Sequence, residues 1–197
     1  MARWGRVAAM YTLIAIPTCV LLAILREGSP LLMSGAWLTL PPAASHTCSL
    51  LLGLAFGSLV AAITRPMVLR LGWAKELHST LRPFARGLSR GAVVCLAILS
   101  AICEELLFRG LLQPWLGLLP QAVLFGLVHQ VPGKSRWVWV AWATLMGALL
   151  GSIFQLTGSL VGAVAAHALI NGFNLSFLKH HDTREPRRRL GGLLGQM

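Results

Sequence analysis

Long apolar runs separated by short polar or basic gaps are the main pattern along the chain. A helix of about 20 apolar residues crosses the hydrocarbon core of a bilayer. The strands of a transmembrane barrel would instead show short segments of alternating polarity, which is not the pattern here. The sequence therefore predicts an all-α, polytopic transmembrane helical bundle. We expect about six spans, at 7–25, 46–64, 91–112, 114–131, 137–157 and 158–178.

Three segments outside these runs have patterns of their own. Segment 31–45 is apolar but contains Pro41 and Pro42, so we expect a re-entrant or interfacial stretch packed on the second span. Residues 74–90 place apolar side chains at helical spacing with basic residues between them, which is typical of an amphipathic helix at the membrane interface. Residues 186–197 are basic and then rich in glycine, and we expect them to be disordered.

Composition favours a membrane protein over other classes. Hydrophobic residues make up 56% of the chain and charged residues 12%, and the mean hydropathy is +0.71. Soluble domains contain about 45–50% apolar and about 25% charged residues. The net charge of +11 is not a sign of nucleic-acid binding, because the 17 Lys and Arg residues lie mostly between the apolar runs. We therefore expect a lipid bilayer as the surroundings and no nucleic-acid partner.

The distribution of basic residues predicts an orientation in the membrane. They gather before the first run, in 65–90, in 132–137 and after residue 179, whereas the alternate gaps hold only Arg26 and Glu27. Basic loops favour the cytoplasmic side. We therefore expect a multi-pass protein of the bacterial inner membrane with both termini in the cytoplasm.

Two adjacent carboxylates, Glu104 and Glu105, lie in the middle of the third run, and Arg109 follows them. Ionisable groups at this depth are costly and usually face a bundle interior or a cavity. Glu105 and Arg109 are four residues apart and can pair on one helix face. Glu104 points about 100° away around the helix, without that partner. A purely structural ion pair is the alternative, but the geometry favours Glu104 for chemistry, with Glu105 and Arg109 as its support.

Two later runs carry polar groups at a matching depth. His129 follows Phe125 by one helical turn, and His167 precedes Asn171 by one turn. Each alone could be a packing residue or interhelical hydrogen-bonding glue. Glu104, His129 and His167, however, each lie about 13 Å below the same membrane face at about 1.5 Å per residue. This shared depth predicts one buried polar site.

This set of side chains suits hydrolysis of an amide by activated water. Glu104 with a histidine would activate the water, and histidine and asparagine side chains would donate hydrogen bonds to the developing oxyanion. Glu104, His129 and His167 would also make a plausible set of three ligands for catalytic zinc. The HExxH spacing that would strongly favour a metal is absent from the sequence. We expect no cofactor and no metal, with zinc as the open alternative.

Three motifs in this order resemble a known family. EELLFR fits EExxxR, FGLVH fits FxxxH and HALIN fits HxxxN, as in the CAAX protease and bacteriocin-processing (CPBP) family of membrane proteins. The resemblance implies an intramembrane glutamic endopeptidase, with Glu104 activating water and His129 helping to position or activate it. It further implies that His167 and Asn171 form the oxyanion hole. These residues would be held in place by Glu105, Arg109 and Phe125.

The resemblance covers about 91–178 and divides the chain into three parts. N-terminal spans with a basic loop (1–90) precede a catalytic helical core (91–178), and a basic flexible tail (179–197) follows. The expected substrate is a membrane-anchored protein or peptide. A non-enzymatic scaffold or immunity-type membrane protein with the same fold is the main alternative. A small proton-coupled carrier is less favoured, because the sequence lacks the internal symmetry of many carriers.

Overall fold

A computed structural model describes residues 3–26 and 29–183, and this part of the chain is helical. Its one β-type pairing is an isolated bridge between Leu32 and Ser159. The predicted all-α class is therefore confirmed. The elements are α1 (Arg3–Leu25), α2 (Pro42–Arg70), α3 (Gly72–Ala85), α4 (Arg90–Glu105), a π-helix η1 (Leu106–Leu112), α5 (Gln113–Leu116), α6 (Leu118–Val128), α7 (Arg136–Thr157) and α8 (Val161–His180). The predicted tail, 186–197, lies outside the described residues.

Five helical segments among the described residues are long and apolar enough to cross a membrane: Gly5–Leu25, Pro42–Arg70, Arg90–Leu116, Arg136–Thr157 and Val161–His180. They match five of the expected spans. The fourth expected span is different, because α6 has 11 residues. At about 1.5 Å per residue, such a helix is about half as long as a membrane crossing needs. Gly117, with a φ of 85°, separates it from α5, and the helix ends before His129.

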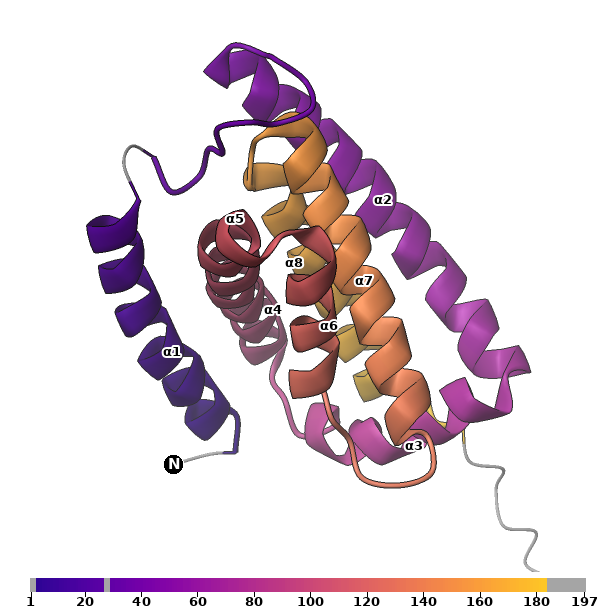
Figure 1. Cartoon of the computed structure of the whole chain (residues 1–197). Coiled ribbons are helices and arrows are strands. Elements are labelled where there is room, and N and C mark those ends of the chain that lie inside the picture. Colours follow the sequence, from indigo (N-terminus) through magenta and orange to yellow (C-terminus); the bar gives the residue numbers. More distant parts are fainter. Residues whose placement is uncertain (1–2, 27–28, 184–197) are drawn as a thin grey trace, which may run out of the picture.

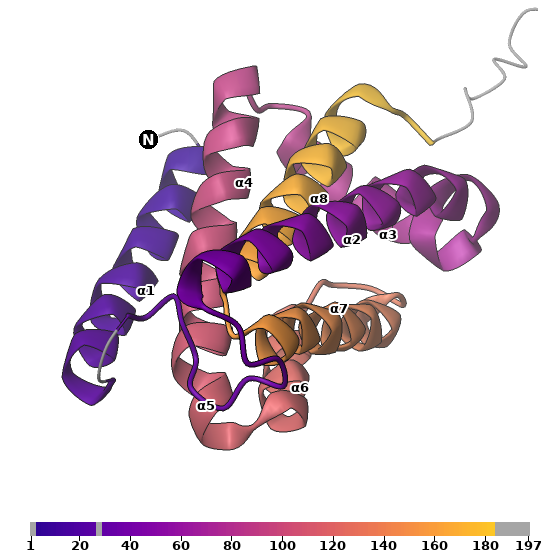
Figure 2. The same cartoon turned by 90° about the horizontal axis from the view of Figure 1, so that it is seen from above.

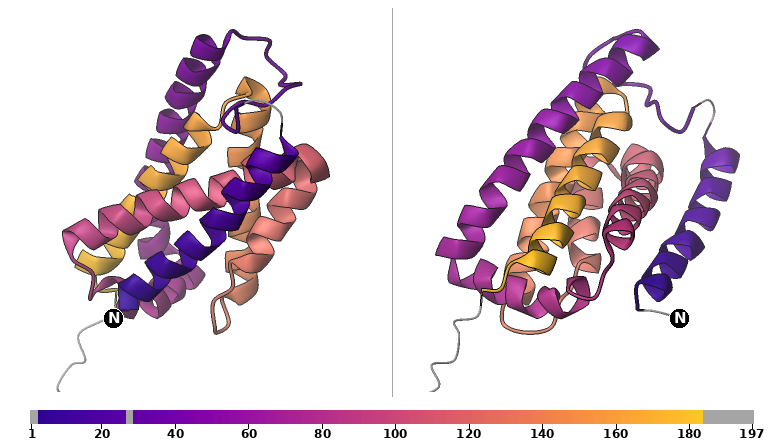
Figure 3. Two further views of the ribbon diagram at one scale, coloured as in Figure 1. Left: turned by 90° about the vertical axis from the view of Figure 1, so that its left-hand side faces the viewer. Right: turned by 180° about the vertical axis from the view of Figure 1, so that it is seen from behind.

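The basic segments lie at one end of the bundle. Figure 1 shows the start of α1, the whole of α3, the loop between α6 and α7, and the end of α8 at the lower end, and Figure 3 shows the same arrangement from two other sides. The connection from α1 to α2 and the junction of α7 with α8 lie at the opposite end. This separation agrees with the pattern of basic residues, whereas the side of the membrane on which the basic end lies stays a prediction.

Small residues let α2 and α8 pack with their backbones in contact. A Cβ atom on Gly53 would lie 2.0 Å from the carbonyl oxygen of Gly162, and one on Gly162 would lie 1.9 Å from that of Ser49. The Ser49 hydroxyl donates to the Ser159 carbonyl at 2.7 Å and accepts from the Gly162 amide at 3.0 Å. Close packing of small residues is a common means of helix association in membranes. It fixes α8, which carries two of the predicted site residues.

The segment before α2 packs on the junction between α7 and α8, next to Ser45 at the start of α2. Met33 N donates to the Gly158 carbonyl at 2.8 Å, and Trp37 N donates to that of Gln155 at 2.9 Å. Gly158 adopts a φ of 70°, in the left-handed region that glycine favours, and it ends α7. The described part of this segment therefore closes the end of the bundle that is opposite α3.

The amphipathic helix predicted within 74–90 is present as α3. Leu77 is buried in this helix, whereas Lys75 and Glu76 are exposed. Leu88, which was included in the predicted helix, is buried but lies beyond the end of α3. Helix α3 packs on α2 and α8 at the basic end of the bundle. Figure 2, seen from above, places α1 on the outer side of α4, with α8 and α2 on the other side of α4, and α6 and α7 together in a separate layer.

Candidate active site

The acidic pair sits where α4 changes into the π-helix η1. Glu105 and Arg109 are fully buried and joined by a bond of 2.8 Å from Nη1 to Oε1. The other terminal nitrogen of Arg109 donates to the Gly147 carbonyl of α7 at 3.0 Å. Short π-helical segments occur frequently at functional sites. The predicted pairing of Glu105 with Arg109 is present, and the arginine also ties η1 to α7.

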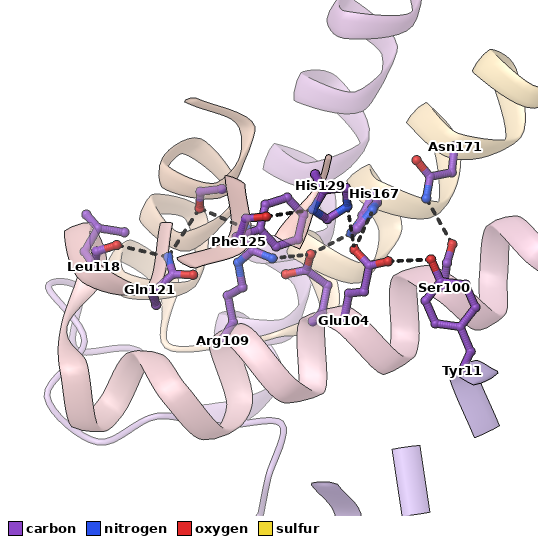
Figure 4. Close-up of polar contacts among 12 residues, drawn as sticks. Tyr11, Ser100, Glu104, Arg109, Leu118, Gln121, Phe125, His129, His167 and Asn171 are labelled. Carbon is purple, nitrogen blue, oxygen red and sulfur yellow. Dashed lines mark hydrogen bonds and ion pairs between the residues drawn. The ribbon is translucent and has the colours of Figure 1, made fainter. Parts of the chain in front are cut away.

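Glu104 faces two imidazoles, one just beyond the end of α6 and one on α8 (Figure 4). Its Oε2 atom lies 3.3 Å from Nε2 of His129 and 3.8 Å from Nε2 of His167. Glu104 is 12% exposed, His167 8% and His129 25%. Oε2 is buried and makes no hydrogen bond within the described protein. The structure thus brings together the three groups that the sequence placed at one depth.

The second nitrogen of each imidazole is held by a group that can only accept a hydrogen bond. Nδ1 of His129 lies 2.7 Å from the Phe125 carbonyl oxygen, and Nδ1 of His167 lies 2.7 Å from Oε1 of Glu105. Each Nδ1 must therefore carry a hydrogen. When either ring is neutral, its Nε2 is a lone-pair acceptor that faces Glu104. When both rings are neutral, the site therefore has three hydrogen-bond acceptors that face one another: Oε2 of Glu104 and the Nε2 atoms of His129 and His167.

Phe125 is the aromatic support of these groups. The guanidinium carbon of Arg109 lies 4.4 Å from the centroid of the Phe125 ring, within the range of a cation–π contact. The ring centroid of His129 is 4.3 Å from that of Phe125, and the ring of Phe108 meets Phe125 edge-on at 5.0 Å. The buried Phe125 ring therefore separates Arg109 from His129 and keeps both in place. The sequence had assigned it this supporting position.

Asn171 is placed differently from the expectation. Its Nδ2 donates to the Ser100 hydroxyl at 3.0 Å, one helical turn before Glu104 (Figure 4). The Ser100 hydroxyl in turn donates to the Ala97 carbonyl at 3.3 Å. The amide thus contacts α4 beside the three-acceptor group, and no hydrogen bond to Glu104 or to either histidine is described for it. Its role in an oxyanion hole stays a prediction.

Sequence analysis missed several polar residues near the site. Tyr11, from the first span, donates its hydroxyl hydrogen to Oε1 of Glu104 at 2.7 Å. Gln113 donates to the Gly151 carbonyl at 3.0 Å, and Gln121 donates to that of Gly147 at 3.4 Å. Each is an uncharged polar residue within an apolar run. That is a weak signal, and only the folded arrangement shows that these side chains cross from one helix to another.

The side chains of Glu104, His129 and His167 are of the kinds that bind zinc. A carboxylate oxygen and two imidazole nitrogens are groups that zinc accepts as ligands. However, no group of three His, Cys, Asp or Glu side chains between residues 3 and 26 or 29 and 183 has an arrangement suited to holding a metal ion. If zinc were bound here, Glu104, His129 and His167 would hold it. Metal dependence therefore stays a question for the experiment described below.

Comparison with known proteins gives a family for the part of the chain that builds this site. Residues 87–173 match the model of the family described as type II CAAX prenyl endopeptidase Rce1-like. This segment, which is less than half of the chain, is similar to the Rce1-like family. The Rce1-like segment begins just before α4 and ends within α8, so it contains Glu104, Glu105, His129 and the other predicted site residues. Tyr11 lies outside it.

An individual relative was also found. The chain is 34% identical over 79 residues to an uncharacterized protein, YpbD, of Bacillus subtilis (strain 168). The alignment covers 40% of this chain and 41% of the relative, so it spans less than half of the relative's length. No solved structure matches the chain. The five long apolar helices and the similarity to a family of CAAX prenyl endopeptidases support an integral membrane protein.

Proposed function

We propose that this protein is an intramembrane endopeptidase that hydrolyses a peptide bond in a membrane-associated protein or peptide, with Glu104 activating the water. The observation that carries the proposal is the position of Glu104 Oε2, which faces the Nε2 atoms of His129 and His167 at 3.3 and 3.8 Å. Three acceptor atoms from three helical segments favour a bound molecule that donates hydrogens, and water is such a molecule. The Rce1-like family supports the same chemistry at the level of proteolysis.

In this mechanism the water oxygen attacks the carbonyl carbon of the scissile bond while Glu104 removes a proton from the water. The tetrahedral oxyanion accepts hydrogen bonds from nearby donors, with Asn171 and a protonated histidine as candidates. The carbon–nitrogen bond then breaks, and the proton held by Glu104 passes to the leaving nitrogen. No covalent intermediate is needed.

The surrounding groups would keep the reacting atoms in place. Glu105 holds Nδ1 of His167, and the Phe125 carbonyl holds Nδ1 of His129, so both rings are fixed in orientation. Arg109 neutralises Glu105 and ties it to α7 through Gly147. Such preorganisation supports electrostatic catalysis because the groups need little rearrangement during the reaction.

The substrate class follows from the surroundings of the site. Glu104 lies in a helical segment long and apolar enough to span a membrane, and large apolar side chains are exposed on the outside of the described bundle. Such a surface suits a bilayer, so a substrate must itself be embedded in or anchored to the membrane. A membrane-anchored peptide or a C-terminal sorting signal fits this requirement.

The test compares the termini of membrane proteins between wild-type cells and cells that carry Glu104→Gln. The substitution keeps the shape of the side chain and removes its basic oxygen. We expect one or more new termini in the wild type to disappear in the variant, with the uncleaved precursor in their place. Glu76→Gln, at an exposed carboxylate of α3, is the matched control and should leave all termini unchanged. Identical termini in all three strains would favour the scaffold alternative.

A further inference from the structure

The first helix contributes one polar contact to the site. The hydroxyl of Tyr11 donates to Oε1 of Glu104 at 2.7 Å, across 93 positions of sequence. Figure 4 shows the ring of Tyr11 reaching from α1 toward Glu104, on the side of the carboxylate away from His129. Tyr11 is the one tyrosine of the chain. The matched Rce1-like segment, 87–173, does not include this residue.

The two oxygens of Glu104 are thus divided between different neighbours. Oε1 accepts from Tyr11, whereas Oε2 faces the two imidazoles. A carboxylate held through one oxygen cannot rotate freely about its last bond. The hydrogen bond therefore directs Oε2 toward the point at which the water is proposed to be activated.

Helix α1 also packs on α4 and η1, and near its start Val7 and Ala8 pack against the apolar cluster that includes Leu96. Among its residues 5–25, only Thr18 and Leu22 are buried. Leu22 lies over Gly110 of η1, since a Cβ atom on that glycine would be 3.8 Å from the leucine side chain. Just beyond α1, Arg26 donates to the Gly110 carbonyl at 2.9 Å. These contacts hold the C-terminal end of α1 against η1. Tyr11 makes its polar contact nearer the N-terminal end of the helix.

We propose that Tyr11 is a positioning residue for the reaction, whose hydroxyl orients the Glu104 carboxylate, and that α1 thereby completes the site built by the Rce1-like segment. This inference rests on the proposed function of Glu104. The competing explanation is that Tyr11 merely satisfies a buried carboxylate and that its loss affects stability alone. The two explanations differ in what happens to turnover when the protein still accumulates normally.

The first experiment tests the contact without any measurement of activity. The full chain is labelled with 3-fluorotyrosine and purified in detergent micelles, so that one tyrosine gives one fluorine resonance. We expect this resonance to shift in Glu104→Gln, where a neutral amide replaces the charged acceptor, and to keep its position in Glu76→Gln. An unchanged resonance in Glu104→Gln would overturn the contact and the inference with it.

The second experiment tests the positioning role. Tyr11→Phe removes only the hydroxyl, and Thr12→Val is the matched control, because the Thr12 hydroxyl bonds the Ala8 carbonyl of its own helix. Cleavage is measured on a synthetic peptide that spans a terminus lost in Glu104→Gln cells. For Tyr11→Phe we expect kcat to fall roughly 10-fold to 100-fold, as for a lost hydrogen bond to a charged group, with KM within about twofold. Thr12→Val should match the wild type.

The outcomes separate this inference from the proposed function. If Glu104→Gln abolishes cleavage while Tyr11→Phe keeps the wild-type kcat, the positioning role is wrong and the proposed function stands. A Tyr11→Phe protein whose loss lies in KM or in accumulation alone also contradicts the positioning role. If Glu104→Gln leaves every terminus unchanged, the proposed function fails, and the positioning role fails with it even where the fluorine resonance reports the contact.

Discussion

Nδ1 of His167 lies 2.7 Å from Oε1 of Glu105, while its Nε2 lies 3.8 Å from Oε2 of Glu104. One imidazole therefore connects the two adjacent carboxylates of the first motif. Glu105 is more than the partner of Arg109, because it also sets which nitrogen of His167 carries the hydrogen. The histidine that faces Glu104 is thus oriented by the neighbouring residue in the same sequence motif.

Arg109 is expected to be needed for folding as well as for activity. Its side chain is fully buried and joins Glu105 to the Gly147 carbonyl. Arg109→Ala leaves a buried carboxylate without its cation, which costs about 3–5 kcal/mol. We expect reduced accumulation and lost cleavage, measured by immunoblot of membranes and by the terminus assay. Arg109→Lys should recover only part of both, because an ammonium cannot bridge two acceptors in the same planar geometry.

The control for this prediction is Arg65→Ala, at an exposed position of α2. Its accumulation should equal that of the wild type. A well-expressed and fully active Arg109→Ala protein would refute the supporting role of the pair.

Asn171 and Ser100 give a paired test of the oxyanion assignment. Asn171→Ala should lower turnover roughly 10²-fold to 10³-fold if the amide donates to the oxyanion. In the described structure this amide donates to the Ser100 hydroxyl at 3.0 Å. Ser100→Ala removes that acceptor and leaves the amide in place, so we expect a much smaller effect on kcat. Equal losses in the two variants would mean that Asn171 acts by holding α4 through Ser100.

Metal removal separates a glutamate mechanism from a zinc mechanism. We expect purified enzyme treated with a chelator to stay active, and elemental analysis to show less than one zinc per chain. Glu104→Gln should nevertheless lower cleavage by roughly 10²-fold to 10⁴-fold, the usual contribution of general acid–base catalysis. Zinc at one per chain, with activity lost on chelation and restored by added zinc, would replace the glutamate assignment and leave proteolysis in place.

The orientation of the bundle is testable with reporter fusions. We expect fusions after residues 68 and 185 to report the cytoplasm and a fusion after residue 40 to report the outside, because basic loops favour the cytoplasmic side. The structure places the ends of α2 and α8 together, opposite the segment before α2. An exported reporter at position 68 would reverse this orientation.

The end of α8 should be held to α3 in a pH-dependent manner. Nε2 of His78, in α3, lies 2.9 Å from the carbonyl oxygen of His181. Burial lowers the pKa of His78 below its usual value, and the nearby His181 and Arg82 side chains act in the same direction. The hydrogen bond to the His181 carbonyl and the charge of Asp182 oppose this lowering. A histidine with a lowered pKa stabilises the folded form while it is neutral. That stability is fully present above about pH 6.5 and is lost as the pH falls below it.

Hydrogen exchange of the backbone amides near residue 181 provides the measurement. We expect their protection to fall as the pH drops below about 6.5, after correction for the intrinsic exchange rate. In His78→Gln, which keeps a donor but does not titrate, the protection should not depend on pH in this range. A pH dependence that persists in His78→Gln would assign the effect to another group, such as His181.

The sequence by itself determined the features that depend on local pattern. Apolar runs of sufficient length specify membrane helices, because a backbone in hydrocarbon must satisfy its own hydrogen bonds. Five of the expected spans follow from this rule. The amphipathic α3 follows instead from apolar residues at helical spacing with basic residues between them. The spacing of Glu105 and Arg109 likewise specified their pairing, since residues four apart share a helix face. The prediction of the fourth span was wrong, because α6 is a short helix that begins after Gly117 and ends before His129.

Only the tertiary structure decided how distant segments meet. The contact of Tyr11 with Glu104 joins two helices that are far apart in the chain. The spacing of residues within either helix does not indicate this contact. The same is true of His167, whose Nδ1 pairs with Glu105, and of Asn171, whose amide reaches Ser100. Depth along a span can be read from residue counts. The rotation of each helix and its choice of neighbour depend on packing, as in the close approach of Gly162 to α2, and packing is settled by the whole bundle.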